Sequence, residues 1–330
     1  MLARPSDAAS TRPLRYALVT AARDEAPHIG RTIRAITAQT LPPRAWVIVS
    51  DGSTDGTDDV VRAWAHQHSW IHLLRVERAT AARSFAAKAH AVNAGFESLA
   101  LLDFELVGNL DADITVPPDY YEFLVQRFAE IPDLGVAGTP FVDVGDPPTS
   151  HSYQSWFANL DHVSGACQLF RRSCFVDIGG YTPVAGGGVD WVAVTRARMR
   201  GWKTRTFLER LCTHYRPMGT ADRARLRARF RHGQEDYLVG SHPLWEAAHG
   251  VVQMTRPPRV FGGLSVMFGY LCAGLSGTPS PVPQDLRDFH RHEQIRRLGS
   301  LVHDALRRLA RTSKRATPDT ADPSQVRYQP

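Results

Sequence analysis

Short apolar runs alternate with segments of helical periodicity through the first two thirds of the chain, and this rhythm limits the folds open to it. Residues 16–20 make the first run, and Ile29, Ile33 and Ile36 follow at the spacing of one helix face. Strands that alternate with helices pair in parallel, and their crossovers cover both faces of the sheet. We therefore predict an α/β fold with a mostly parallel sheet and helices on both faces. Further strands are expected at residues 46–49, 71–74, 106–110 and 134–141.

Asp111 and Asp113 come directly after the run at residues 106–110, and Pro117 and Pro118 close the loop that follows. In an open α/β sheet, ligands bind beyond the carboxyl ends of the strands. Two carboxylates at this edge would repel each other unless a hard divalent cation joined them to an anion such as a diphosphate. The alternative is that Asp111 caps a helix and Asp113 lies in a solvated turn, because short motifs often occur by chance.

Asp51 follows the run at residues 46–49 and opens an Asp-Gly pair. A carboxylate in this place can accept hydrogen bonds from a base N–H or a ribose hydroxyl, although an ordinary turn is an equal alternative. Neither G-x-G-x-x-G nor G-x-x-x-x-G-K-[ST] occurs in the sequence. The dinucleotide-binding and P-loop classes are therefore unsupported.

Asp190 comes shortly after three consecutive glycines, Gly186 to Gly188, and lies at the start of a helical segment that Gly201 ends. This pattern predicts a mobile loop that presents a carboxylate at its tip. The alternatives are that Asp190 only caps its helix and that the glycines form a surface loop without function.

The formal net charge of +6 and the pI near 9.3 come from arginines concentrated in the last half of the chain. Such an excess favours an anionic partner, which could be a nucleotide diphosphate, a phospholipid surface or nucleic acid. The four cysteines have no C-x-x-C or metal-binding spacing, so buried thiols in a reducing compartment are expected. Residues 1–15 lack the apolar core of a signal peptide. We therefore expect a cytoplasmic protein.

Taken together, these features resemble the inverting GT-A glycosyltransferases of family 2. The resemblance covers residues 16–216, and it lies in the order and spacing of the features. They are residues 20–25, the loop 50–57, Lys88 with Asn93-Ala94-Gly95, Asp111-Ala112-Asp113, residues 170–180, Asp190 and His214. The resemblance implies a GT-A sheet that binds a nucleotide-diphosphate sugar at its carboxyl edge.

It also implies a role for each matching residue. Asp190 is expected to deprotonate the acceptor hydroxyl, so that direct displacement inverts the anomeric carbon. Asp111 and Asp113 are expected to hold Mg²⁺ or Mn²⁺ on the diphosphate. His214 could be a third metal ligand, a diphosphate contact or a structural residue. Lys88 could be a diphosphate counter-ion or a solvated helix residue. The expected nucleotide-binding residues are Ala22, Glu25, Asp51, Lys88 and Asp111.

The chain departs from the family pattern in three places. The usual Asn-Glu after the first strand is Asp24-Glu25, which leaves the base and ribose contacts there open. The usual Glu-Asp pair is Val189-Asp190, so the aspartate is present but its acidic neighbour is lost. The Q-x-x-R-W motif of the processive synthases is absent, since the segment 234–237 lacks both Arg and Trp. Non-processive transfer is therefore expected.

Residues 260–284 contain no charged side chain, and residues 260–275 are largely apolar with several glycines. About 20 apolar residues are needed to span a bilayer, so an interfacial or re-entrant segment is expected, beside an arginine-rich amphipathic helix at residues 285–314. Nearby arginines attract an anionic leaflet. This favours peripheral contact with the inner face of the plasma membrane, near a lipid-linked or saccharide acceptor. A helical hairpin packed on the catalytic domain is the alternative.

We expect a flexible N-terminus at 1–14, a GT-A catalytic domain at 15–216, a helical extension at 217–315 and a disordered tail at 316–330. The leading function is metal-dependent sugar transfer in glycan, glycolipid or cell-envelope polysaccharide assembly. One alternative is a nucleotidyltransferase, which would need a Gly-rich basic loop after the first strand. The other is a non-catalytic membrane-binding protein on a degenerate transferase scaffold. No basic motif interleaved with aromatics indicates RNA, so nucleic acid is not expected as a partner.

Overall fold

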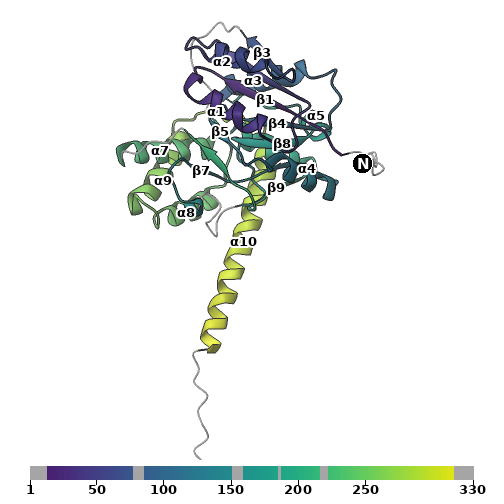
Figure 1. The fold of residues 1–330 in the computed structure, drawn as a ribbon. Coiled ribbons are helices and arrows are strands. Elements are labelled where there is room, and N and C mark those ends of the chain that lie inside the picture. Colours follow the sequence, from purple (N-terminus) through teal and green to yellow (C-terminus); the bar gives the residue numbers. More distant parts are fainter. Residues whose placement is uncertain (1–12, 77–84, 151–158, 185–186, 216–221, 316–330) are drawn as a thin grey trace, which may run out of the picture.

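The computed structural model describes residues 13–76, 85–150, 159–184, 187–215 and 222–315 (Figure 1). The strands are β1 (Tyr16–Ala22), β2 (Ala45–Asp51), β3 (Ile71–Val76), β4 (Leu106–Leu110), β5 (Ile114–Thr115), β6 (Leu134–Gly138), β7 (Phe141–Asp143), β8 (Cys167–Arg171), β9 (Lys203–Thr206) and β10 (Cys212–His214). The helices are α1 (Ala26–Thr37), α2 (Thr57–Ala65), α3 (Phe85–Ser98), α4 (Tyr120–Glu130), α5 (Arg172–Asp177), α6 (Val189–Met199), α7 (Asp222–Leu238), α8 (Pro243–Gln253), α9 (Arg259–Leu275) and α10 (Gln284–Arg315), with a 3-10 turn at Pro148–Ser150.

A seven-stranded sheet with the order β3-β2-β1-β4-β8-β6-β9 forms the centre of the molecule. All of its neighbouring strands run parallel except β8, which is antiparallel to both β4 and β6. This confirms the predicted α/β class and mostly parallel sheet. The antiparallel strand β8 was not predicted. The run at 134–141 was predicted as one strand, but it divides into β6 and β7, which belong to different sheets.

Both faces of the sheet are buried under helices, which explains why its central strands carry few polar residues. One core gathers Ile29, Ile33 and Ile36 of α1 and the aromatic face of α4 against β1 and β2. The core on the opposite face packs α3, α5 and α6 on alternate residues of the same strands. Helices packed on both faces therefore fix the ends of β1, β2 and β4, where the loops to the site begin.

A small second sheet, with the order β5-β10-β7, lies beyond the carboxyl end of β4. Its central strand β10 pairs antiparallel with β5 and parallel with β7, so that His214 is opposite Ile114 on one side and Asp143 on the other. This sheet brings three segments that are far apart in the sequence next to Asp113. Of the cysteines expected to be buried, Cys167, Cys174 and Cys212 are buried free thiols, whereas Cys272 is only half-buried.

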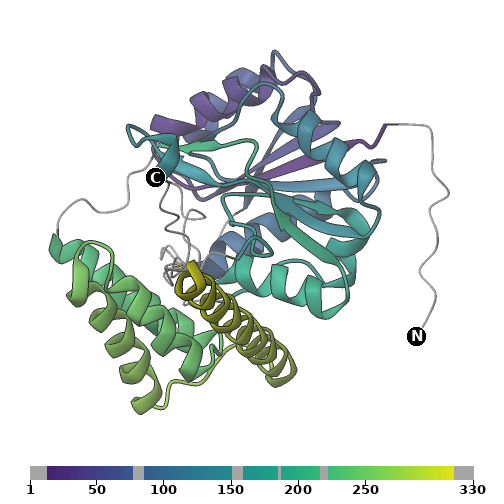
Figure 2. The same cartoon turned by 90° about the horizontal axis from the view of Figure 1, so that it is seen from below.

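Helices α7, α8 and α9 form a group beside the sheet, and α10 passes this group and extends away from the body (Figures 1 and 2). The interfacial segment expected at 260–275 is helix α9, which packs on α7 through its small residues. Gly269 and Gly233 allow this close approach, because a Cβ at Gly269 would lie 2.0 Å from the Phe230 carbonyl oxygen. Among the described residues, no helix combines the length and the apolar character needed to cross a membrane.

We expect Gly269→Ala to destabilise the protein, because the added methyl group forces α7 and α9 apart. Overpacking of this kind costs about 1–3 kcal/mol. Gly299→Ala is the matched control, since no atom lies within 4 Å of a Cβ at this position in α10, and a helical Gly→Ala change in open space stabilises by about 0.5–1 kcal/mol. Thermal and urea unfolding of both variants measures the difference. Equal stability of the two variants would contradict the close helix contact.

Candidate active site

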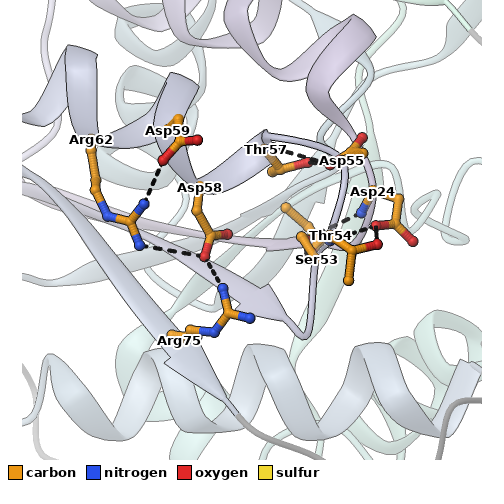
Figure 3. A network of polar contacts seen from close by, with 10 residues as sticks. Asp24, Ser53, Thr54, Asp55, Thr57, Asp58, Asp59, Arg62 and Arg75 are labelled. Atoms are coloured by element: carbon orange, nitrogen blue, oxygen red, sulfur yellow. Dashed lines mark hydrogen bonds and ion pairs between the residues drawn. The ribbon is translucent and has the colours of Figure 1, made fainter.

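The loops after β1 and β2 hold each other in place at the edge of the sheet (Figure 3). The backbone N–H of Asp24 donates to Ser53 Oγ at 3.2 Å, and the N–H of Thr54 donates to Asp24 Oδ1 at 2.9 Å. The Glu25 N–H donates to Thr57 Oγ1 at 2.8 Å. Asp24 has a positive φ of 52°, a conformation that Asp tolerates better than most residues. The polar side chains of the two loops thus make one rigid wall.

A cavity of about 210 Å³ opens between this wall and the aspartates after β4. Six predicted site residues line it, and they come from β1, β2, α3 and the end of β4. These residues are Ala22, Glu25, Asp51, Lys88, Asp111 and Asp113. Asp51 ends β2 and is 6% exposed, so its carboxylate belongs to the cavity floor and not to a solvated turn. The cavity lies at the carboxyl edge of the sheet, the usual ligand-binding edge of such folds.

Lys88 and Asp111 form an ion pair in this cavity, with 2.5 Å between Nζ and Oδ1. Burial on its own would lower the pKa of Lys88, but the carboxylates of Asp111, Asp190 and Asp113 raise it above its ordinary value. Burial raises the pKa of Asp111, and Lys88 opposes that shift. Lys88 is therefore a half-buried cation paired with a carboxylate of the cavity, which favours the interpretation as a diphosphate counter-ion.

His214 lies between two carboxylates of the small sheet and the β4 loop. Its Nε2 is 3.4 Å from Asp113 Oδ2, and its Nδ1 is 2.8 Å from Asp143 Oδ1. The hydrogen bond with Asp113, opposed by burial and reinforced by Asp143, raises the pKa of His214 to about 9. Asp143 fixes the ring so that Nε2 points at Asp113.

Carboxylates with one imidazole are ligands that suit Mn²⁺ and can hold Mg²⁺. Asp113 is 8% exposed and faces His214 Nε2. His214 Nδ1 contacts Asp143, and a carboxylate in this place orients metal-bound histidines in many proteins. Asp113 therefore fits a divalent ion, and His214 would join it as a ligand once an ion displaces the proton that Asp113 and Asp143 stabilise. Asp111 forms its ion pair with Lys88 in the same cavity.

Asp190 lies in the first turn of α6 and faces a second cavity of about 290 Å³. Its Oδ2 accepts a hydrogen bond from the Gly165 backbone N–H at 2.9 Å. Lys88 and Asp111 line both cavities, which therefore adjoin, and His214 lines the second one. The structure thus brings all the predicted site residues to two neighbouring cavities.

Three residues that hold the site together were not predicted from the sequence: Asn109, Gly165 and Asp143. Asn109 Nδ2 donates to the Gly165 carbonyl at 2.7 Å, and the same carbonyl is 3.4 Å from Lys88 Nζ. Gly165 has no room for a side chain, since a Cβ would lie 2.7 Å from Asp190 Cβ. Asp143 orients His214. Of the three, only Asn109 had a sequence signal, as a buried amide inside an apolar strand that needs a hydrogen-bond partner.

Comparisons with known proteins agree with this geometry. The model of the family described as "Glycosyltransferase like family 2" matches residues 13–233, which is most of the described fold. The chain belongs to glycosyltransferase family 2. A family 2 relative, the poly-beta-1,6-N-acetyl-D-glucosamine synthase of Staphylococcus epidermidis, is 25% identical over 172 residues, which are 47% of this chain and 39% of the relative. The chain thus spans about two fifths of that relative's length.

Solved structures share the fold. The mannosyltransferase PcManGT of Pyrobaculum calidifontis, in complex with GDP-Man and Mn²⁺, aligns with a TM-score of 0.53 and 22% identity over 92% of this chain and 83% of that chain. S. aureus TarS 1–349 in complex with UDP-GlcNAc aligns with a TM-score of 0.52 and 11% identity over 84% of this chain and 78% of that chain. At these identities the likeness concerns the GT-A fold of this family 2 enzyme.

Proposed function

We propose that this family 2 enzyme transfers a sugar from a nucleotide diphosphate to an acceptor hydroxyl, with inversion, metal dependence and no processive polymerisation. The observation that carries the proposal is the pair of adjoining cavities, with Asp51 in one, Asp190 in the other and Lys88 and Asp111 in both. The relative that makes a polysaccharide favours a saccharide or lipid-linked acceptor in glycan, glycolipid or cell-envelope polysaccharide assembly. We further propose that residues 15–216 are the catalytic domain and residues 217–315 its helical extension.

The donor would lie in the cavity of about 210 Å³. Asp51, at the end of β2, would accept hydrogen bonds from the base or ribose, and Ala22 and Glu25 would border the nucleotide. Lys88 would place its positive charge beside the diphosphate, where charge develops as the leaving group departs. Asp111 and Asp113, with His214, would hold Mg²⁺ or Mn²⁺. Such an ion, when bound, neutralises the diphosphate and makes it a better leaving group.

The acceptor would reach the anomeric carbon from the side of Asp190. A sugar hydroxyl is a weak nucleophile, so a carboxylate within hydrogen-bond reach must take its proton as attack proceeds. The Gly165 N–H occupies one oxygen of Asp190 and orients the carboxylate. With Asp190 acting as a base and not as a nucleophile, displacement would be direct and would invert the anomeric carbon.

Titration with a panel of nucleoside diphosphates and their sugars, with and without Mn²⁺, tests the proposal. We expect one nucleotide family to bind in a Mn²⁺-dependent way and its sugar to be released or transferred on turnover. The nucleotidyltransferase alternative predicts pyrophosphate as the product. The non-catalytic alternative predicts no turnover with any donor. The presence of Asp51, Asp111, Asp113 and Asp190 argues against it.

We also propose that α9 rests on a membrane surface at the cytoplasmic side. One face of α9 packs inward through glycines, and its large apolar side chains point outward. Arg256 and Arg259 stand at its start, where they would attract an anionic leaflet. The outward side chains are Val260, Phe261, Leu264, Phe268, Leu271 and Leu275.

Flotation with phosphatidylglycerol vesicles at low salt measures this contact. We expect the double variant Phe261→Glu/Leu271→Glu to bind vesicles at least ~10-fold more weakly, because each apolar side chain loses about 1.5–3 kcal/mol of burial. The matched control is Val302→Glu/Leu306→Glu, which changes two residues of α10 that are 52% and 60% exposed. Equal vesicle binding by the wild-type protein and the α9 variant would contradict the membrane proposal.

A further inference from the structure

Helices α7 and α8 bring four metal-ligating side chains to one point, away from the aspartates of the active site. His232 and Asp236 are four residues apart on α7, and Glu246 and His249 are three residues apart on α8. Both spacings place side chains on one face of a helix. The two faces meet, since the His232 and His249 rings have centroids 5.7 Å apart.

The ligand atoms of His232, Asp236 and His249 all lie within 4.8 Å of one another, and Glu246 lies beside His249. Asp236 Oδ2 is 3.7 Å from His232 Nε2 and 3.8 Å from His249 Nδ1. Glu246 Oε2 is 3.9 Å from His249 Nδ1. These distances are too long for hydrogen bonds. They are close to the edge of about 3.4 Å that a tetrahedron has when its ligands lie about 2.0–2.2 Å from a metal.

The carboxylates of this cluster are buried without compensation. Glu246 is 2% exposed, and neither of its oxygens makes a hydrogen bond; the same holds for Asp236 Oδ2. Two buried carboxylates of this kind call for a cation.

Gln253 supplies the outer contact that a metal-bound histidine needs. Its amide lies 2.8 Å from His249 Nε2, while its Oε1 is buried and makes no hydrogen bond. The amide nitrogen and oxygen exchange places on a half-turn of the side chain. In the turned orientation Oε1 accepts the Nε2–H of His249, which leaves the lone pair on Nδ1, the nitrogen that faces Asp236 and Glu246.

We infer that His232, Asp236 and His249 form a site for one divalent transition-metal ion, with zinc as the preferred occupant and Glu246 beside it. Two imidazoles with a carboxylate favour zinc over Mg²⁺, which prefers oxygen ligands and retains water. The ion joins α7 to α8. Asp236 and His249 also line a cavity of about 580 Å³ that reaches Ser164 and Trp191. A metal ion in this site would stabilise one side of the cavity. Ser164 and Trp191, the sequence neighbours of Gly165 and Asp190, lie in the same cavity.

The test is the zinc content of the full chain after treatment with a chelator, reloading with Zn²⁺ and gel filtration. We expect one tightly held zinc in the wild-type protein. We expect the same in Asp113→Asn, which changes one active-site aspartate and none of the α7–α8 side chains. His249→Gln should lose this zinc, and Gln253→Ala should weaken zinc binding by about 10- to 100-fold. His303→Gln is the control, because His303 is exposed on α10. Reloading with Co²⁺ gives a second readout, the visible absorption of a tetrahedral ion.

His232→Ala serves if His249→Gln fails to fold, since the His232 side chain is 50% exposed. Loss of the zinc in His232→Ala, with an unchanged circular dichroism spectrum, supports the site. Retention of the zinc in both α7 and α8 variants would overturn it. A wild-type protein that holds no zinc would also overturn it. A proton shared by Asp236 and Glu246 would then neutralise one of the two buried carboxylates.

Discussion

Asp190→Asn is expected to bind the nucleotide donor as the wild-type protein does and to lose at least ~10² in turnover. The asparagine keeps the shape of the side chain and can still accept the Gly165 N–H through its amide oxygen, a bond that is 2.9 Å long in the native chain. It cannot accept a proton from the acceptor hydroxyl. General base catalysis contributes about 10²- to 10⁴-fold to such steps. The loss should therefore appear in kcat and leave the nucleotide Kd unchanged.

Calorimetry gives the nucleotide Kd, and product release at saturating donor gives kcat. Asp288→Asn is the control, because Asp288 is exposed on α10 and touches neither cavity. Turnover within a factor of a few of the wild-type value in Asp190→Asn would remove Asp190 from the role of base. A parallel loss of nucleotide binding would point to collapse of the Gly165 segment instead.

Asp113→Ala is expected to abolish turnover and the Mn²⁺ dependence of nucleotide binding while the fold stays intact. Asp113 is 8% exposed and faces His214 Nε2 at the cavity edge. Its loss removes one of two charges that would hold the ion. Ion-mediated stabilisation of a leaving group is worth several kcal/mol, so a fall of at least ~10³ in turnover follows.

Nucleotide titrations with Mn²⁺ and with a chelator, on the variant and the wild-type protein, measure this effect. Asp146→Ala is the matched control, since Asp146 is an exposed aspartate just beyond β7. Restoring Mn²⁺ alone after chelation separates this site from the α7–α8 cluster, which favours zinc. Nucleotide affinity that is the same with chelator, with Mn²⁺ and in Asp113→Ala would refute the assignment.

Local pattern was enough to predict the main sheet and the aspartates at its edge. The runs at 16–20 and 46–49 are buried on both faces, so their composition alone marks them as strands, whereas the run at 71–74 forms the partly exposed edge strand β3. Asp51 and Asp111 follow such runs directly, and parallel strands end at one edge. The strands that place Asp51 and Asp111 at this edge can therefore be recognised from the sequence alone.

The rest depends on contacts between distant segments. Strand β8 pairs antiparallel with β4 and β6, which lie far from it in sequence, and nothing within residues 167–171 reveals that direction. Asp143 reaches His214 only through the pairing of β7 with β10. The expectation of an interfacial segment at 260–275 followed from its lack of charge. It missed that the glycines gather on one face, which is what allows α9 to pack against α7.

The backbone of Gly165 connects the expected donor site to the expected acceptor site. Its carbonyl is held by Asn109 and lies near Lys88, and its N–H is held by Asp190. A diphosphate that draws Lys88 toward itself therefore disturbs the same rigid unit that aims Asp190. Linkage is reciprocal, so whatever a bound donor does to acceptor affinity, a bound acceptor does to donor affinity. Gly165, through the N–H of one peptide group and the carbonyl of the next, would therefore couple donor binding to acceptor binding.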